Sequence, residues 1–161
     1  MKVGFFLWLL NQEKLLTQDN LQRRGWNFPN HCYLCEEETE TVRHLFIECK
    51  YSKEVWNGIS DGTGQHWNAP LTIKEILTRK RANDLNSKGK ELWNPLQVAT
   101  CWCLWKARNE VYFNGNKAHT QKIVKDIKVQ ALLWVSGNGC FKGITCKFGV
   151  LNWKLLFFDP P

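Results

Sequence analysis

No apolar run in this sequence is long enough to cross a bilayer. The longest, residues 3–10, is far shorter than the roughly 20 residues that a transmembrane helix needs. Polar and charged residues follow this run without a small-residue cleavage site, so we expect no secretory signal. The seven cysteines are odd in number and unevenly spaced, which disfavours a secreted disulfide framework. The sequence therefore predicts an intracellular protein, nuclear or cytoplasmic, with no membrane partner.

The composition indicates a folded chain with an uneven charge. Apolar residues make up 43% of the 161 residues and aromatic residues 13%, enough for the core of one domain or of two small ones. The net charge is +7. Residues 1–49 hold five basic and seven acidic residues, so the excess of basic residues lies entirely after Cys49. Any surface that binds a polyanion is therefore expected in the later two thirds of the chain.

Local patterns predict a mainly α protein. We expect a buried helix over residues 3–10, a short helix after Thr17 that ends near Gly25, and a further short helix capped by Thr41. Ser52 is expected to cap the next helix. Thr72 and Glu75 form a capping-box pattern that opens a helix over residues 73–80.

The second half is expected to hold the longest helices. The polar stretch 83–90 is predicted to be a linker or loop, after which Asn94 and Pro95 suit the start of a helix that runs to Phe113. Thr120 is expected to cap another helix ending near residue 137. The remainder, residues 137–161, is rich in glycine and β-forming residues and is predicted to form a short extended tail, with a hairpin as the alternative.

One motif carries specific chemistry, namely C-x2-C-x8-H-x4-C, formed by Cys32, Cys35, His44 and Cys49. Two thiolates on a tight turn, an imidazole and a third thiolate form a tetrahedral set that favours zinc over magnesium or calcium. Four protein ligands leave no open position for water, so the predicted site is structural. His31 is the weaker histidine candidate, because adjacent residues such as His31 and Cys32 rarely bind the same ion.

The remaining cysteines carry a weaker signal. Cys101 and Cys103 lie two residues apart on a predicted helix, so they point to different faces and do not suit one ion. Cys140 and Cys146 flank a glycine-containing stretch. We interpret these four as buried thiols, with a second metal site as the alternative.

The first third of the chain resembles the reverse transcriptase zinc-binding domain of plant LINE-type (non-LTR) retroelements. The resemblance covers roughly residues 1–58 and rests on the ligands together with flanking residues, in the order Phe5–Leu10, Leu15–Thr17, Leu21, Arg24, Gly25, Cys32, Cys35, Glu40–Phe46, Cys49, Val55 and Trp56. The stretches 105–110 and 113–115 are similar to the region downstream of that domain. The resemblance implies zinc held by the four residues of the motif and descent from a longer polyprotein.

The resemblance also suggests a domain division. Residues 1–58 would form the zinc-binding domain, residues 59–90 a linker with a short helix, and residues 91–161 a helical downstream region. The chain opens almost at the zinc domain, so we expect a form without the catalytic modules of such elements. The expected fold is thus a small zinc-bound helical module followed by a helical region and an extended tail.

The sequence predicts no catalysis. No Gly-rich phosphate loop or nucleophile elbow occurs, and no two aspartates are adjacent, so the paired metal-binding aspartates of a polymerase are missing. Four acidic residues follow position 90, and they are too scattered to form a ribonuclease H-like two-metal site: Glu91, Glu110, Asp126 and Asp159.

The expected partner is RNA or DNA, but not at the zinc site itself. The segment 31–49 carries five acidic residues, Glu36, Glu37, Glu38, Glu40 and Glu48, against one arginine, which makes it a poor phosphate contact. The candidate contacts are basic residues outside that segment, namely Lys50, Lys53, Arg79, Lys80, Arg81, Lys122, Lys125 and Lys128. Trp26 and Trp67 lie in polar settings that suit base stacking, whereas Trp8, Trp56, Trp102 and Trp105 are expected in the core.

Two other interpretations remain open at this point. The chain is alternatively a protein-interaction or structural appendage that docks onto a polymerase module of the parent element, with no nucleic-acid binding. It is also interpretable as an inactive element remnant.

Overall fold

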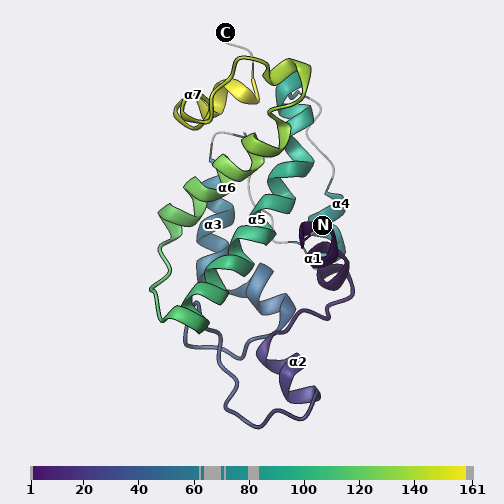
Figure 1. The fold of residues 1–161 in the computed structure, drawn as a ribbon, viewed down its shortest axis with the longest axis vertical. Helices are drawn as coiled ribbons and strands as arrows, with labels where there is room; N and C mark the ends of the chain where they lie inside the picture. The colour runs from purple at the N-terminus through teal and green to yellow at the C-terminus, as the bar shows by residue number, and fades with distance from the viewer. Residues whose placement is uncertain (1, 62, 64–69, 71, 80–83, 159–161) are drawn as a thin grey trace.

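The chain is mainly helical in a computed structural model, which describes residues 2–61, 63, 70, 72–79 and 84–158 (Figure 1). No strand occurs among these residues, which confirms the mainly α class. The elements in order are α1 (Lys2–Asn11), α2 (Gln18–Arg23), η1 (His44–Glu48), α3 (Lys50–Ser60), α4 (Ile73–Thr78), α5 (Ser87–Asn114), α6 (Thr120–Val135), η2 (Gly139–Phe141), α7 (Cys146–Leu151) and η3 (Trp153–Leu156). None of the helices in the described part combines the length and apolar character needed to cross a membrane.

The long helix α5 is the axis of the fold. It runs along the long dimension of the molecule with α6 packed beside it, and the short α2 and the cysteine-containing loop lie at one end (Figure 1). Leu96 and Leu104 of α5 and Ile127 of α6 are fully or almost fully buried. They belong to one continuous cluster of buried residues that reaches from α1 to η3. The amino-terminal segment therefore shares its core with the later helices.

Helix α5 begins earlier than the sequence predicts. Asn86 is its N-cap, with Oδ1 accepting a 2.8 Å hydrogen bond from the Gly89 N–H, so residues 87–90 are helical and not part of a linker. Pro95 lies inside the helix, so the predicted start at Asn94 and Pro95 is wrong. The reason is a long-range contact: a Cβ on Gly89 would lie 3.0 Å from the Cα of Phe157, and the Asn86 N–H donates to the Phe157 carbonyl. The carboxyl-terminal segment thus packs against the first turn.

Several predicted helix ends are confirmed. Gly115 follows α5 with a φ of 67°, and Gly25 follows α2 with a φ of 91°, both in the left-handed region that glycine adopts easily. The capping box of Thr72 and Glu75 is present at α4. Thr120 is the first residue of α6 and His119 is its N-cap, so the predicted cap is one residue late.

The carboxyl-terminal tail is not extended, contrary to the prediction. Within residues 137–158 it forms η2, α7 and η3, and the Thr145 side chain caps α7 by accepting a hydrogen bond from the Phe148 N–H. Trp153 and Phe157 are buried, with their rings 5.3 Å apart. Burial of these apolar residues against the helices outweighs the local β preference.

Helix α1 is buried on one face only. Phe6 lies in the core with its ring 5.1 Å from that of Trp102 and 6.4 Å from that of Phe46, so it joins α5 to η1. Phe5 and Trp8 are 63% and 57% exposed, so the prediction of a fully buried helix and of a core position for Trp8 is wrong. An unbroken apolar run does not reveal which side of a helix faces solvent.

The other three tryptophans that were predicted to lie in the core are buried or partly buried. Trp56 is buried and its Nε1 donates a 2.9 Å hydrogen bond to the Phe46 carbonyl. Trp102 and Trp105 are partly buried and pack against the core cluster. Trp26 is exposed, and Trp67 lies outside the described residues.

Candidate metal centre

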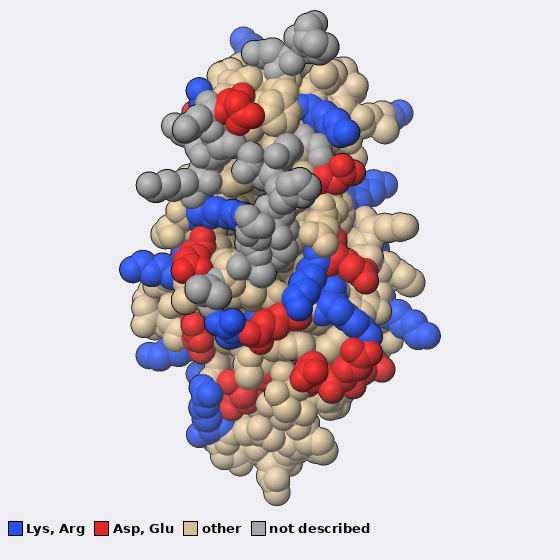
Figure 2. All heavy atoms as spheres, turned by 180° about the vertical axis from the view of Figure 1, so that it is seen from behind, with Lys and Arg blue, Asp and Glu red and all other residues tan. Residues whose placement is uncertain are grey.

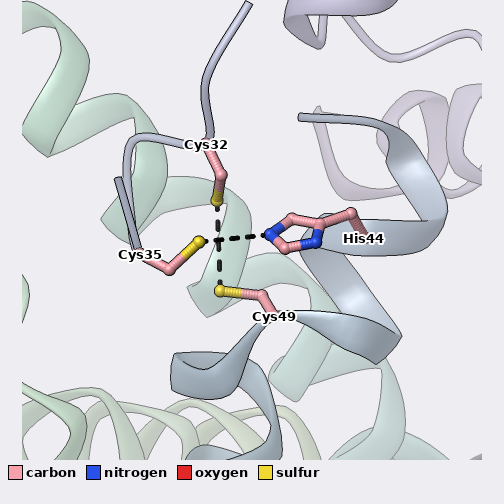
Figure 3. Close-up of side chains that lie close together, drawn as sticks. All are labelled: Cys32, Cys35, His44 and Cys49. Carbon is pink, nitrogen blue, oxygen red and sulfur yellow. Dashed lines mark hydrogen bonds between the residues drawn. The ribbon is translucent and has the colours of Figure 1, made fainter. Parts of the chain in front are cut away.

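The four residues of the motif lie together at one point (Figure 3). The Sγ atoms of Cys32 and Cys49 are 3.9 Å apart, and the Cys35 Sγ lies 3.4 Å from Nε2 of His44. All four candidate ligand atoms fall within 4.8 Å of one another, and all four residues are buried. The prediction that these side chains meet is confirmed.

These distances fit a tetrahedral zinc ion. With Zn–S bonds of about 2.3 Å and a Zn–N bond of about 2.0–2.1 Å, tetrahedral geometry places two sulfurs about 3.8 Å apart and a sulfur and a nitrogen about 3.6 Å apart. The observed separations of 3.9 and 3.4 Å lie close to both values. Three sulfurs and one imidazole nitrogen are also the donors that zinc prefers over calcium or magnesium. The residues present therefore fit this ion.

A tight turn places the first two ligands. The Cys32 N–H donates a 2.7 Å hydrogen bond to the Glu38 carbonyl, and the Glu36 N–H donates a 2.8 Å bond to the Cys32 carbonyl. Glu36 adopts a φ of 59°, an uncommon value for a residue other than glycine. These contacts fold the chain back directly after Cys35, so both sulfurs face the same point.

A widened helical turn places the other two ligands. In an α-helix with 3.6 residues per turn, two residues five positions apart point about 140° away from each other. The segment η1 is instead a π-helical turn, in which the Cys49 N–H bonds to the His44 carbonyl at 2.7 Å. This widening brings His44 and Cys49 to the same side. The sequence predicted a short helix here but carried no signal for the wider turn.

Two helix caps were predicted near the site, Thr41 and Ser52, and only the first is confirmed. The Thr41 Oγ1 accepts a 2.9 Å hydrogen bond from the His44 N–H, so Thr41 caps this turn as predicted. Ser52 does not cap α3. The N-cap is Cys49, and the Ser52 hydroxyl lies inside the helix and donates to the Leu45 carbonyl.

The clustered ligands change one another's acidity in the metal-free chain. A hydrogen bond from Cys32 and a second contact with His44 lower the pKa of Cys49 to about 4, despite its burial. The bond to Cys49 together with burial raises the pKa of Cys32 well above its usual range. Burial lowers the pKa of His44, but the contacts with Cys49 and Cys35 outweigh this effect and raise it to about 9. At neutral pH the metal-free site thus holds a Cys49 thiolate beside a protonated His44 and a protonated Cys32.

Zinc uptake is therefore expected to release protons. Cys32 and His44 must both lose a proton to bind the ion, and Cys35 must also bind as a thiolate, so the apparent affinity should rise with pH by at least two logarithmic units per pH unit between about pH 6 and pH 8. The measurement is a competition titration with a zinc chelator of known pH dependence. An affinity that does not change over this range would contradict the assigned protonation states.

The other candidate ligands lie elsewhere. His31 is exposed, its ring 4.9 Å from that of Tyr33, and it is outside the cluster. Burial raises the pKa of the Cys101 thiol to about 12 and that of Cys103 to about 11, as for inert buried thiols. Cys140 and Cys146 are only partly buried, so the prediction of buried thiols is wrong for this pair. Within the part of the chain that the structure describes, no second group of His, Cys, Asp or Glu is arranged to hold a metal.

The acidic residues near the site differ in burial and in ion pairing, which the sequence does not indicate. Glu40 is fully buried, so it does not belong to the negative surface that the sequence predicts around the cysteines. Glu37 pairs with Lys50 and Glu48 pairs with Arg43. Glu36 and Glu38 are exposed. The surface beside the metal centre is thus partly neutralised.

Glu40 forms a buried ion pair that sequence analysis missed. Its Oε1 lies 2.6 Å from Nη2 of Arg108 on α5, and it also accepts a 3.1 Å hydrogen bond from the Gln18 N–H at the start of α2. Both side chains are almost completely buried, at 0% and 2% exposure. Because positions 40 and 108 are far apart in the sequence, no local pattern could reveal the pair.

Aromatic rings surround the same arginine. The guanidinium carbon of Arg108 lies 5.1, 5.3 and 4.9 Å from the ring centres of Tyr33, Trp105 and Tyr112. Tyr33 stands between Cys32 and Cys35 in the sequence and packs on Tyr112 at 4.8 Å. Arg108 therefore joins the cysteine turn, α2 and α5 into one unit.

The candidate nucleic-acid contacts that the structure describes lie on α3, at the end of α4 and on α6. Lys53, Lys122 and Lys125 are exposed, Lys50 pairs with Glu37, and Lys128 lies over the Trp153 ring at 5.1 Å. Arg79 is partly buried, and burial lowers its pKa. Lys80 and Arg81 lie outside the described residues. Figure 2 shows basic and acidic side chains intermixed over one face of the molecule.

Comparison with known proteins agrees with the geometry. Residues 1–56 match the model of a family described as zinc-binding in reverse transcriptase. A protein of Arabidopsis thaliana named as a ribonuclease H protein is 23% identical over 139 residues, which are 85% of this chain and 22% of that protein. The chain thus spans about a fifth of that relative's length, and the matched region extends well beyond residue 56. No solved structure matches the chain.

The resemblance inferred from the sequence is therefore confirmed for the zinc-binding segment. The ligand cluster and the family match together show that residues 1–56 are a zinc-binding segment similar to that of reverse transcriptases. The assignment to LINE-type elements of plants stays a prediction, as do the domain boundaries at residues 58 and 90.

Proposed function

We propose, from the match of residues 1–56 to the zinc-binding family of reverse transcriptases, that this chain is a non-catalytic structural module that binds nucleic acid. The observation that carries the structural part is the closed set of four buried protein ligands. A set of this kind leaves no coordination position for water or substrate. When bound, zinc supplies a cross-link between the cysteine turn and η1.

Two observations support the absence of catalysis. Among the described residues, the zinc ligands are the only group of His, Cys, Asp and Glu arranged to hold a metal. Glu91 and Glu110 instead accept hydrogen bonds from Asn138 and Asn116. A two-metal nuclease needs several carboxylates around a shared pair of ions. We therefore expect no cleavage of an RNA–DNA hybrid in the presence of magnesium.

The net charge of +7 supports nucleic-acid binding, because cationic neutralisation of phosphates provides most of the affinity for a polyanion. Lys122 and Lys125 are exposed on α6, three residues apart and hence on the same side of the helix. They are the best-placed members of the predicted set.

The test is the salt dependence of binding to single-stranded RNA. We expect the wild-type affinity to fall steeply with salt, and the double substitution Lys122→Glu and Lys125→Glu to weaken binding and flatten the slope by about 0.7 for each lost phosphate contact. The matched control is Lys142→Glu with Lys147→Glu, which makes the same charge change at two exposed positions. Equal losses in both variants would mean that only net charge matters, and no binding at low salt would reject the nucleic-acid role.

A protein-docking role is the second candidate, favoured by α1. The rings of Phe5 and Trp8 stack at 5.9 Å on its exposed face. Exposed aromatic pairs of this kind are typical of protein interfaces. Under this alternative the partner is a polymerase module of the parent element, and the substitutions Phe5→Ser and Trp8→Ser should abolish its binding while leaving any RNA affinity unchanged.

A further inference from the structure

An apolar hollow lies between the loop after α2 and the last turns of α5. Its volume is about 270 Å³, and its walls include Trp26 and Phe28 on one side and Tyr112 and Phe113 on the other. Trp26 is 63% exposed and Phe113 is 72% exposed, which is unusual for such large apolar side chains. We call this hollow the aromatic groove.

The walls of the groove are held in place by the metal-binding segment. Tyr112 packs edge-on against Tyr33 of the cysteine turn, and its ring also lies edge-on to that of Phe113 at 4.6 Å. Arg108, which also lines the groove, is fixed by Glu40. On the opposite wall, the Gln22 side chain donates a 2.8 Å hydrogen bond to the Phe28 carbonyl. The rings are thus presented by a preorganised scaffold.

The charges around the groove suit an anionic polymer. Its lining contains no carboxylate, and the charge of Arg108 is balanced by the buried Glu40. Arg23 and Arg24 stand just before Trp26 in the sequence and are both exposed. Arg23 pairs with Asp19, whereas Arg24 has no acidic partner among the residues that the structure describes. Arg24 thus offers an exposed positive charge two residues before Trp26 in the sequence.

We propose that the aromatic groove binds unpaired bases of single-stranded RNA or DNA by stacking. Flat aromatic faces next to cationic residues are the usual means by which proteins hold single strands without sequence preference. Asn109 lies in the lining and its Oδ1 accepts a hydrogen bond from Arg108, so its amide N–H₂ is available to a base edge. A lining dominated by aromatic rather than aliphatic residues favours bases over an apolar peptide. This inference rests on the proposed nucleic-acid role and adds the surface and the form of nucleic acid.

The test compares a labelled single-stranded oligonucleotide with the corresponding duplex on the full chain. We expect single-strand preference, and we expect Trp26→Ala and Phe113→Ala each to weaken single-strand binding roughly tenfold without changing the salt slope, because stacking releases no counterions. Trp26→Phe should retain most of the affinity. Phe148→Ala on α7 is the matched control, since it removes another exposed aromatic side chain. Both groove positions are exposed, so the variants are expected to stay folded, which circular dichroism checks.

The other outcomes separate this proposal from the proposed function. Unchanged single-strand affinity in Trp26→Ala and Phe113→Ala, together with weakening by Lys122→Glu and Lys125→Glu, would overturn the groove and keep the nucleic-acid role. Equal affinity for the single-stranded and the duplex oligonucleotide would overturn the proposal that unpaired bases stack in the groove. Absence of any oligonucleotide binding would reject both. A groove that instead binds an amphipathic leucine-rich peptide, with loss in Trp26→Ala, would assign the surface to a protein partner.

Discussion

The substitution His44→Ala is expected to remove the bound zinc and to unfold the amino-terminal segment. The four ligands come from two separate turns, which a bound zinc ion would cross-link. Structural zinc contributes about 10–16 kcal/mol in zinc-finger peptides, as much as the entire stability of a typical domain. Metal analysis of the purified protein should give one zinc per chain, lost in His44→Ala and in Cys35→Ser, and circular dichroism should show reduced helicity.

His31→Ala is the matched control, because it removes the neighbouring imidazole that lies outside the cluster. This variant should keep its zinc and its helicity. Loss of the metal in His31→Ala with retention in His44→Ala would reverse the assignment of the histidine ligand. Two zinc ions per wild-type chain would instead show that a second site exists, to which the later cysteines contribute: Cys101, Cys103, Cys140 or Cys146.

The substitution Arg108→Met is expected to cost about 3–5 kcal/mol of unfolding free energy. It keeps the bulk of the side chain but leaves the Glu40 carboxylate buried without its cation, and breaking one side of a buried ion pair carries a penalty of this size. The measurement is urea unfolding of the zinc-loaded protein. The same variant should bind zinc more weakly, because Glu40 lies in the segment that joins the two ligand turns.

Two further variants make this prediction specific. The double substitution Glu40→Gln and Arg108→Met removes both charges and should recover a large part of the loss, since no unpaired ion remains. Arg23→Ala breaks the exposed pair with Asp19 and should cost less than about 1 kcal/mol. A loss in Arg108→Met no larger than that in Arg23→Ala would show that the buried pair contributes little.

The metal site was predictable because its information is local. Four ligand-type residues within a short segment, with a pair of cysteines two residues apart, indicate the ion without any knowledge of the fold. Capping patterns such as Thr72 with Glu75 and the glycines after α2 and α5 are local for the same reason. The π-helical turn at His44 has no sequence signal of its own.

The remaining features depend on contacts between distant residues. The start of α5 is set by Phe157 against Gly89, which overrides the polar composition of the preceding stretch and the preference of Pro95 for a first helical turn. The tail is helical because Trp153 and Phe157 find a buried position. From local sequence Glu40 resembles the other acidic residues around it, and only its contact with the distant Arg108 accounts for its burial.

The pairing of Glu40 with Arg108 also constrains how sequences of this kind can diverge. Replacing either residue alone by an uncharged one leaves an unpaired charge in the interior, whereas replacing both by uncharged residues does not. Among related sequences, positions 40 and 108 should therefore vary together. A gene fragment that kept the cysteines but lost the second half of the chain would inherit a metal site with an unbalanced acid beside it.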